Sequence, residues 1–323
     1  MKVALIHDWL VSYRGGEKVL EALCELYPDA PIYTLFVDKK KLPKKLQEKN
    51  IIYQKNINKF KSFRKLLLPF LPSMIESFNL NEYDLIISSS SCVAKGVIPS
   101  PTAYHVSYIH SPMRYIWDER SCYFNSFKSI PFASGIIHSI LKNLRLWDTT
   151  SNNRVDLFIS NSNFIKKRVN RYYRRESLVV HPPVNIKRFS ENMEKKRNSY
   201  FFMLGAFVPY KRFDIAIKAF NFMKENLIIA GDGPDIKPLQ NLCGPTVKLI
   251  QRPSQEEIVL LMRHARAFIF PGTEDFGITA IEALASGTPL IAHKSGGALD
   301  FLEEGINGLF FEEKNESSLA KAV

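Results

Sequence analysis

The sequence predicts an α/β protein made of two doubly wound, Rossmann-like domains. Short apolar runs of strand length alternate with longer amphipathic stretches, an order typical of parallel sheets covered by helices. The chain has 323 residues, which is longer than a single core usually grows, so two domains are expected. Several apolar runs end in glycine-containing loops, and open parallel sheets bind ligands at that edge.

Strands are expected in both halves of the chain, with helical stretches between many of them. The first half has strand-like runs at 2–6, 31–36, 84–87, 105–109, 156–159 and 178–180, and the second at 200–205, 227–230, 267–270 and 288–292. Helices are expected at 213–223, at 278–285 and at 258–265, the last after a Ser254-x-x-Glu257 capping box. A polar, strand-free link at 185–198 predicts domains at 1–185 and 186–323.

The strongest candidate site is the loop that follows the third run of the second half. Glu274 and Glu282 flank Gly277, where a helix is expected to begin. The backbone N–H groups of that first turn, those of Gly277, Ile278 and Thr279, suit a diphosphate because the helix dipole adds to them. The two carboxylates would accept hydrogen bonds from a sugar on one side and a ribose on the other. Glutamates are usually solvated, so neighbouring loops must support this interpretation.

Three further loops at strand ends support a ligand site. Gly231-Asp232-Gly233 is a turn that would let a flat base approach the backbone. Lys211 and Arg212 follow another strand and could neutralise phosphate oxygens, although such pairs often face solvent. A fourth run leads to Gly296-Gly297 and a further expected helix start, with Asp300 in its first turn.

In this order the segments resemble glycosyltransferase family 4, which are retaining enzymes of the GT-B fold. The resemblance covers nearly the whole chain, and its details are most similar to bacterial mannosyltransferases that build lipopolysaccharide O-antigen and exopolysaccharide. The motifs that carry it are Glu274-x-Phe276-Gly277-x-x-x-x-Glu282, Gly231-Asp232-Gly233-Pro234, Val208-Pro-Tyr-Lys-Arg212, Gly287–Ala292 with Gly296-Gly297, Gly15-Gly16-x-Lys18, His110–Trp117 and Pro182–Asn185.

The resemblance implies that the two domains face each other across a cleft that holds a nucleotide-sugar donor. Glu274 would bind hydroxyls of the transferred hexose, and Glu282 those of the ribose. His110, at a strand end, would lie beside the sugar; taken alone, a histidine there is as often structural. The remaining donor-binding candidates are Gly15, Gly16, Lys211, Arg212, Gly231, Asp232, Gly233, Phe276, Gly277, Ile278 and Thr279, and the catalytic candidates are His110, Lys211 and Glu274.

Some features depart from the family pattern. Ala206 stands where the resembling enzymes commonly carry an Arg, so either Arg212 supplies that charge or the diphosphate is held more weakly. Asp300 stands where a Glu is common. Residues 315–323 begin like a helix and then stop, which leaves the final crossing helix of the family incomplete.

The implied mechanism needs no dedicated catalytic base. The leaving phosphate oxygen can take the proton of an acceptor hydroxyl on the same face, while cations and helix N-termini stabilise the developing charge. Likeness alone suggests GDP-mannose as the donor, and a lipid-linked or oligosaccharide acceptor. No tightly bound cofactor and no metal are expected, because the Asp and His residues lack ligand spacing.

The excess of positive over negative charge lies entirely in the first half. Residues 1–180 hold 27 Lys and Arg against 15 Asp and Glu, whereas 181–323 hold 17 of each. The segment 39–65 is strongly basic and runs into the apolar 66–71, a combination suited to an anionic membrane surface. A solvated loop followed by a core helix is the equal alternative. The candidate membrane or acceptor residues are Lys44, Lys45, Lys55, Lys59, Lys61, Arg64 and Lys65.

Composition also limits the location and leaves rival functions open. No apolar run reaches the roughly 20 residues that a spanning helix needs, no signal peptide is expected, and the four cysteines show no paired spacing. A cytoplasmic protein, peripheral on the inner face of the plasma membrane, is expected. One rival is a non-catalytic protein that binds nucleic acid through 39–65 and 168–175, although no nucleic-acid partner is expected. The other is a sugar-nucleotide epimerase or hydrolase.

Overall fold

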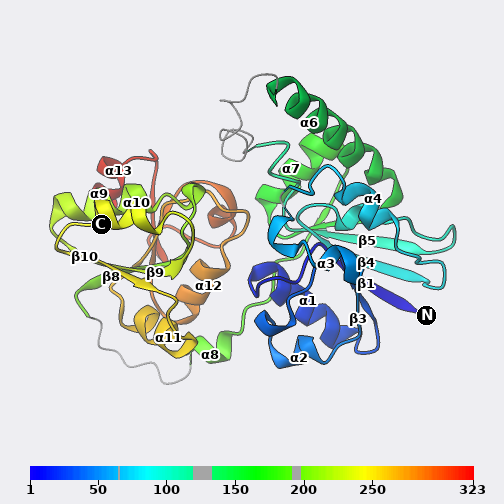
Figure 1. Cartoon of the computed structure of the whole chain (residues 1–323). Helices are drawn as coiled ribbons and strands as arrows, with labels where there is room; N and C mark the ends of the chain where they lie inside the picture. Colours follow the sequence, from blue (N-terminus) through cyan, green and yellow to red (C-terminus); the bar gives the residue numbers. More distant parts are fainter. Residues whose placement is uncertain (65, 119–132, 191–197) are drawn as a thin grey trace. The chain divides into compact units, whose positions relative to one another are not determined.

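A computed structural model describes residues 1–64, 66–118, 133–190 and 198–323. The chain divides into two compact units, Met1–Pro183 and Val184–Val323 (Figure 1). Each unit has its own parallel sheet and its own apolar core.

The sheet of the first unit has seven parallel strands in the order β3-β2-β1-β4-β5-β6-β7. The chain moves outward from β1 to β3 and then returns to place β4 on the other side of β1. In such sheets the carboxyl ends at this reversal form the usual binding crevice. The strands are β1 Val3–His7, β2 Ile32–Thr34, β3 Ile51–Ile52, β4 Leu85–Ser90, β5 Tyr104–Ile109, β6 Leu157–Ser160 and β7 Leu178–Val179.

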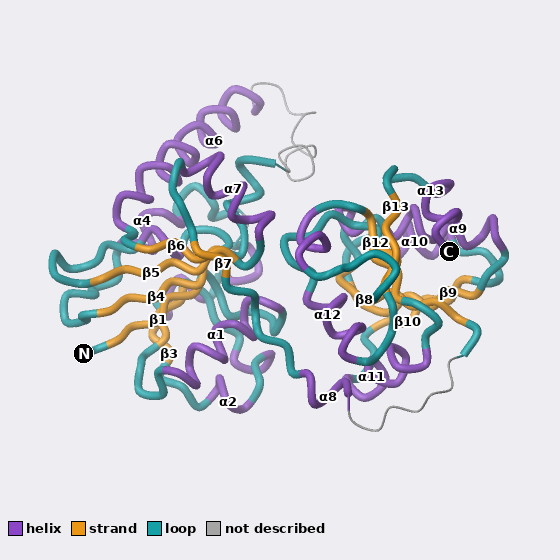
Figure 2. Tube along the Cα trace, turned by 180° about the vertical axis from the view of Figure 1, so that it is seen from behind, coloured by secondary structure: helices purple, strands orange, loops and turns teal. Residues whose placement is uncertain are grey.

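Helices cover both faces of this sheet. Figures 1 and 2 show α1 and α2 on one face and α4 and α6 on the other, and an apolar cluster fills each layer. The helices are α1 Gly15–Leu26, α2 Lys44–Gln47, α3 Lys55–Asn58, α4 Leu71–Glu76, α6 Ala133–Thr150 and α7 Asn163–Tyr173, with 3-10 turns η1 Lys39–Lys41, η2 Lys61–Phe63, η3 Ala94–Gly96 and η5 Ser151–Arg154.

A buried carboxylate joins the two central strands. Asp8 directly follows β1, and its oxygens accept hydrogen bonds from the N–H groups of Ser91, Cys92, Val93 and Ala94 at 2.6 to 2.9 Å. The Ser91 hydroxyl donates a fifth bond at 3.0 Å. A buried charge is tolerated only when its oxygens are hydrogen-bonded, and here the loop after β4 supplies every donor. This array holds the carboxyl ends of β1 and β4 together.

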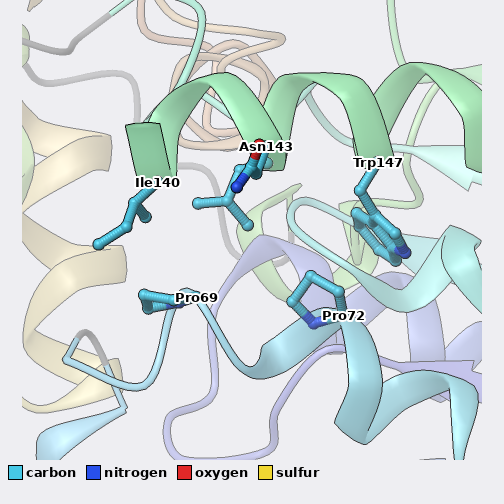
Figure 3. Close-up of a pocket in the computed structure, with 6 residues that line it drawn as sticks. Pro69, Pro72, Ile140, Asn143 and Trp147 are labelled. Carbon is cyan, nitrogen blue, oxygen red and sulfur yellow. The ribbon is translucent and has the colours of Figure 1, made fainter. Parts of the chain in front are cut away.

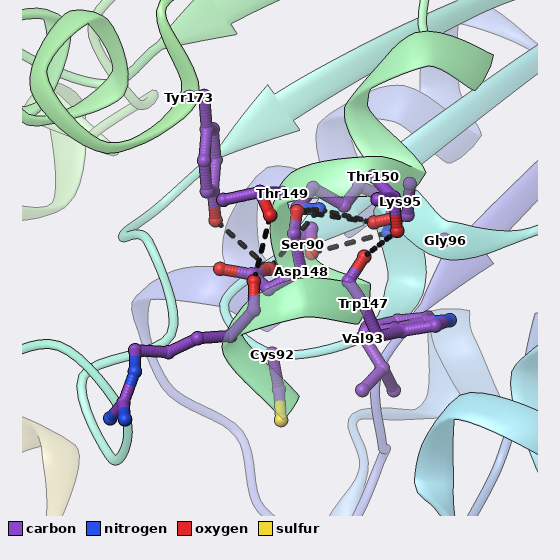
Figure 4. Close-up of polar contacts among 12 residues, drawn as sticks. Ser90, Cys92, Val93, Lys95, Gly96, Trp147, Asp148, Thr149, Thr150 and Tyr173 are labelled. Carbon is purple, nitrogen blue, oxygen red and sulfur yellow. Dashed lines mark hydrogen bonds and ion pairs between the residues drawn. The ribbon is translucent and has the colours of Figure 1, made fainter. Parts of the chain in front are cut away.

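A second buried charge ties the loop after β4 to the helical layer. The Lys95 ammonium lies 3.1 Å from an Asp148 carboxylate oxygen and donates to the Asp148 carbonyl and the Ser151 hydroxyl at 2.6 and 2.7 Å (Figure 4). The Tyr173 ring packs 4.7 Å from the same nitrogen. Burial lowers the pKa of Lys95, while Asp148 opposes that shift. Because a buried ammonium needs partners, this network fixes how η3, α6 and α7 pack.

The sheet of the second unit has six parallel strands in the order β10-β9-β8-β11-β12-β13, with the reversal between β8 and β11. One apolar layer lies under α9 and α13, and the other lies under α11 and α12. The strands are β8 Tyr200–Ala206, β9 Asn226–Asp232, β10 Val247–Gln251, β11 Phe268–Phe270, β12 Leu290–His293 and β13 Gly308–Phe311; the helices are α8 Ile186–Ser190, α9 Phe213–Met223, α10 Ile236–Leu242, α11 Gln255–His264, α12 Ile278–Ala285 and α13 Glu316–Ala322, with 3-10 turns η6 Pro209–Lys211 and η7 Gly296–Asp300.

The elements agree with the sequence pattern where local signals were strong. The bounds of α9 and α12 are those predicted, and the Ser254 capping box begins α11, since the Ser254 hydroxyl accepts from Glu257 N at 3.1 Å. The prediction missed β3, β10 and β13. The helix expected after Gly297 is the short turn η7.

Candidate functional site

The central feature of the second unit is an ion pair at the reversal point of its sheet. The Lys211 ammonium, at the end of the turn after β8, donates to a Glu274 carboxylate oxygen at 2.5 Å. Glu274 lies in the loop after β11, the strand next to β8. Both side chains are largely buried, with 11% and 16% exposed. Partial removal from water strengthens their attraction, so the pair places a cation and an acceptor together at the sheet edge.

Backbone packing holds the Glu274 loop in place. Gly296 has a φ of 67°, and a Cβ there would lie 2.5 Å from the Glu274 carbonyl oxygen. The Gly297 N–H donates to that same carbonyl oxygen at 2.9 Å. The turn after β12 therefore supports the loop after β11 at a distance that only glycine permits. This is the contact that the Gly296-Gly297 motif serves within the unit.

The helix that follows the loop offers hydrogen-bond donors. Gly277 precedes α12 with a φ of 104°, and the first-turn N–H groups of Ile278 and Thr279 have no acceptor within the helix. The Thr279 hydroxyl oxygen is buried and has no hydrogen-bond partner in the described structure. Glu282, one turn further on, is only 5% exposed, which is unusual for a glutamate. Unused donors and a buried acid thus lie on one short helix.

The other predicted donor-binding residues of this unit have internal partners. Arg212 is bound by Asp214 through two hydrogen bonds of 2.9 Å, so its charge is already balanced. Asp232 accepts a bond from Arg252 at 2.7 Å. A Cβ at Gly231 would lie 1.9 Å from the Gly205 carbonyl oxygen, and one at Gly233 would lie 2.5 Å from that of Phe207. Packing within the unit therefore requires both glycines, whatever else they do. Phe276 is buried and packs edge-to-face on Phe301.

The first unit gathers two histidines at the carboxyl ends of its central strands. The Ser89 hydroxyl lies 3.1 Å from Nδ1 of His7 and 2.8 Å from Nε2 of His110. Burial, and then the nearby His7, lower the pKa of His110 to about 3, so its imidazole is neutral at physiological pH. A Cβ at Gly16 would lie 3.5 and 3.6 Å from the two rings, which places the start of α1 directly against them.

The structure thus brings together residues within each unit. Lys211 and Glu274 meet in the second unit, and Gly16 and His110 meet in the first. Gly15 begins α1 beside Gly16. Sequence reasoning did not select His7 or Ser89, because the His7–Ser89 and Ser89–His110 contacts join residues 82 and 21 positions apart. Their common position at strand ends was the signal available.

The predicted membrane residues lie on short helices and turns with several exposed apolar neighbours. Lys44 and Lys45 belong to α2, Lys55 begins α3 with Lys59 just after it, and Lys61 begins η2 before Arg64. Lys65 lies outside the described residues. Lys45 pairs with Glu25, Lys61 pairs with Asp38, and Arg64 packs over Trp9. The exposed apolar side chains of this segment are Phe60, Phe63, Leu66 and Phe70.

An apolar groove lies beside this segment, between the start of α4 and α6. It has about 480 Å³ of space that is partly open to solvent, and Figure 3 shows Pro69 and Pro72 opposite Ile140, Asn143 and Trp147. The apolar run 66–71 is divided, because Leu68 and Leu71 are buried whereas Leu66 and Phe70 are exposed. Part of this segment thus packs into the core and part is exposed, and membrane binding stays a prediction.

The described residues contain neither a candidate metal site nor a helix that could cross a membrane. Outside the gaps at 65, 119–132 and 191–197, no group of three or more His, Cys, Asp or Glu side chains could hold a metal ion. None of the helices in the same residues is long and apolar enough to cross a membrane. Cys24, Cys92 and Cys243 are free thiols, and Cys122 lies outside the described residues.

Comparison with known proteins relates the second unit to a family. Residues 184–323 match the family described as glycosyl transferases group 1. The chain is 31% identical over 175 residues to an uncharacterised glycosyltransferase of Methanocaldococcus jannaschii, a match that covers 52% of this chain and 48% of that protein. It is 37% identical over 87 residues to a GDP-mannose-dependent alpha-mannosyltransferase of Corynebacterium glutamicum, covering 27% and 21%. The chain thus spans about half or less of these relatives.

Solved structures establish the fold. HepE of Anabaena in complex with UDP has a TM-score of 0.71 at 18% identity, covering 99% of this chain and 88% of that one. Sucrose-phosphate synthase of Thermosynechococcus elongatus has a TM-score of 0.69 at 16% identity, covering 100% and 88%. These neighbours confirm the predicted fold class, two parallel-sheet Rossmann-like domains of the GT-B type.

We expect Gly296→Ala to destabilise the second unit by about 2 to 3 kcal/mol, because the new Cβ meets the Glu274 carbonyl oxygen and the backbone is left-handed. Gly305→Ala is the matched control: its φ is 79°, but nothing lies within 4 Å of the added Cβ, so a cost of about 1 kcal/mol is expected. Urea unfolding of both variants measures the difference. Equal losses would show that the contact with the Glu274 loop adds no constraint.

Proposed function

We propose that the protein is a retaining glycosyltransferase that transfers a hexose from a nucleoside-diphosphate sugar to a lipid-linked or oligosaccharide acceptor. The proposal rests on the largely buried Lys211–Glu274 ion pair, which lies where the strand order of the second sheet reverses. The unit that contains this sheet matches the glycosyl transferases group 1 family. The N–H groups at the start of α12, one turn before the buried Glu282, support the proposal, because a helix start binds phosphate oxygens.

Donor binding would use groups that already lie at the edge of the second sheet. The first turn of α12 would donate its N–H groups to phosphate oxygens, and the unpartnered Thr279 hydroxyl is a further donor. Lys211 holds one oxygen of Glu274, so the other oxygen can accept from a hexose hydroxyl while the ammonium faces the phosphate. Glu282 would accept from the ribose hydroxyls.

The reaction would break the bond between the anomeric carbon and the donor phosphate and form one from that carbon to the acceptor oxygen. The acceptor proton would pass to the leaving phosphate oxygen on the same face. Lys211 and the α12 N-terminus would stabilise the charge that grows on the diphosphate, which lowers the barrier without a protein base. His110, kept neutral, would hydrogen-bond a hexose hydroxyl rather than add a charge.

For the donor we propose GDP-mannose. The match to a GDP-mannose-dependent mannosyltransferase supports this choice, although it covers only 27% of the chain. The HepE structures contain UDP or UDP-glucose, so uridine nucleotides are the natural competitors. A role in O-antigen or exopolysaccharide synthesis belongs to the same proposal.

For location we propose peripheral binding to an anionic membrane surface on the cytoplasmic side. Exposed Phe60, Phe63 and Phe70 accompany the basic residues of 39–64, which is the combination that binds headgroups and the upper acyl region. The nucleic-acid rival is weaker, because Tyr173 is buried and Tyr172 already stacks on Trp117 at 4.7 Å. These two tyrosines are therefore less available for base stacking, and Phe60 and Phe63 are the exposed rings that a nucleic-acid surface would use.

We expect GDP-mannose to raise the melting temperature most in a panel of GDP, UDP, ADP and their hexose conjugates, because a ligand stabilises the folded state according to its affinity. A clear preference for UDP-sugars would reject mannosyl transfer but keep the enzyme class. Free sugar or an altered hexose, formed without acceptor, would favour the hydrolase or epimerase. Binding of RNA or DNA without any nucleotide-sugar would favour the nucleic-acid rival.

We expect Glu274→Ala to reduce sugar transfer at least about 100-fold, while GDP affinity changes by less than about threefold, because the carboxylate would contact the hexose and not the nucleotide. Glu303→Ala, an exposed glutamate of the same unit, is the control and should keep full activity. Steady-state transfer assays and calorimetry measure the two quantities. Turnover of Glu274→Ala at the wild-type rate would remove this residue from its role.

We expect replacing Lys44, Lys55 and Lys59 together by Gln to reduce co-sedimentation with vesicles rich in anionic lipid, since each exposed cation near headgroups contributes about 1 kcal/mol. The control replaces Lys167, Arg171 and Arg174 by Gln. These residues are exposed on or just after α7 of the same unit, and their replacement removes the same amount of charge. If both triple variants pellet with the vesicles to the same extent, net charge, and not this surface, determines membrane binding.

A further inference from the structure

A series of polar contacts joins the Glu274 loop to a lysine and a histidine of the neighbouring segments. The Lys314 ammonium, just after β13, donates to the Thr273 hydroxyl at 2.6 Å. The Thr273 hydroxyl lies 2.8 Å from that of Ser295, which lies 2.5 Å from Nδ1 of His293. An ammonium can only donate, so the Thr273 hydroxyl accepts from Lys314, and its own proton is free to point toward Ser295. Burial, and then the nearby Lys314, lower the pKa of His293, which favours its neutral form.

Lys314 differs from the other two cations at this edge in the partner that it contacts. Lys211 is paired with Glu274, and Arg212 is paired with Asp214. Across the described residues, no carboxylate lies within ion-pair distance of Lys314, whose hydrogen-bond partner is a neutral hydroxyl. Burial, and then the positive charge of Arg212, lower the pKa of Lys314. Lys314 and Arg212 are therefore close enough for their charges to repel each other.

The position of Lys314 matches a need of this edge. Thr273 lies between Glu274 and Gly272, and a Cβ at Gly272 would lie 2.9 Å from the Lys211 Cα. The end of β8 carries Ala206, which supplies no charge. Lys314, just after β13, therefore contacts the loop that carries Glu274, the partner of Lys211.

We propose that Lys314 is a ligand of the donor diphosphate. This inference rests on the proposed function and deepens it. An ammonium has three N–H donors, and Thr273 takes one, which leaves two for phosphate oxygens. The Thr273–Ser295–His293 chain positions the ammonium, because Ser295 lies within hydrogen-bond distance of both Thr273 and His293 and so restrains the hydroxyl that Lys314 contacts.

The test compares nucleoside diphosphates with monophosphates by calorimetry on the full chain. Lys314→Met is expected to weaken GDP binding about tenfold or more, and GMP binding by less than about threefold, because a charge-assisted bond to the outer phosphate is lost. Lys314→Arg should retain most of the GDP affinity. Lys294→Met is the matched control, since Lys294 is exposed on the neighbouring loop and is already paired with Glu312 at 2.6 Å. The series is repeated with UDP and UMP.

The outcomes separate this inference from the proposed function. If the wild type binds a diphosphate and Lys314→Met binds it equally well, the role of Lys314 is wrong and the enzyme class is untouched. If the variant loses diphosphate and monophosphate affinity to the same degree, Lys314 only stabilises the loop and the inference is again wrong. If the wild type binds none of the four nucleotides, the proposed function fails and the inference fails with it.

Discussion

The ion pair between Lys211 and Glu274 is the interaction around which the second unit is arranged. It forms only because β8 and β11 are neighbours at the point where the strand order reverses, so that two loops far apart in sequence meet. Ion pairs that keep some contact with water contribute little to stability, so this pair matters for where it places its two groups rather than for the energy it adds. Its significance comes from the glycine turn after β12 and the hydroxyl contacts of Thr273, which restrict the same loop from two other strands.

The first unit uses buried charge differently. Asp8 and Lys95 are almost completely buried, and each has hydrogen-bond donors or acceptors supplied by the segments it joins. Such groups are costly to bury and expensive to leave unpaired, so they specify one arrangement of the loop after β4. His110 lies at the same edge but is held through Ser89 and stays neutral. This edge therefore combines fully buried charges with a neutral, half-buried imidazole.

Local pattern predicted most of the framework and part of the site. Strongly apolar runs and capping residues placed α9, α11 and α12, because these signals act within a few residues. The local pattern missed three strands. Strand β3 has only two residues, Lys248 interrupts the apolar pattern of β10, and β13 begins at a glycine. The Arg212–Asp214 pairing and the reach of Lys314 to Thr273 could not be predicted, because they depend on rotamers and on contacts across 41 residues.

The Asp8 array also sets an order of events during synthesis. Its donors lie 83 to 86 residues later in the chain, so the first strand emerges with a carboxylate that stays hydrated until β4 and its loop arrive. At translation speeds of about 5 to 20 residues per second, that interval lasts roughly 4 to 17 s. The amino-terminal strand must therefore remain unaggregated while its central partner is still being made, and a nascent chain stalled before Ser91 would lack its native sheet centre.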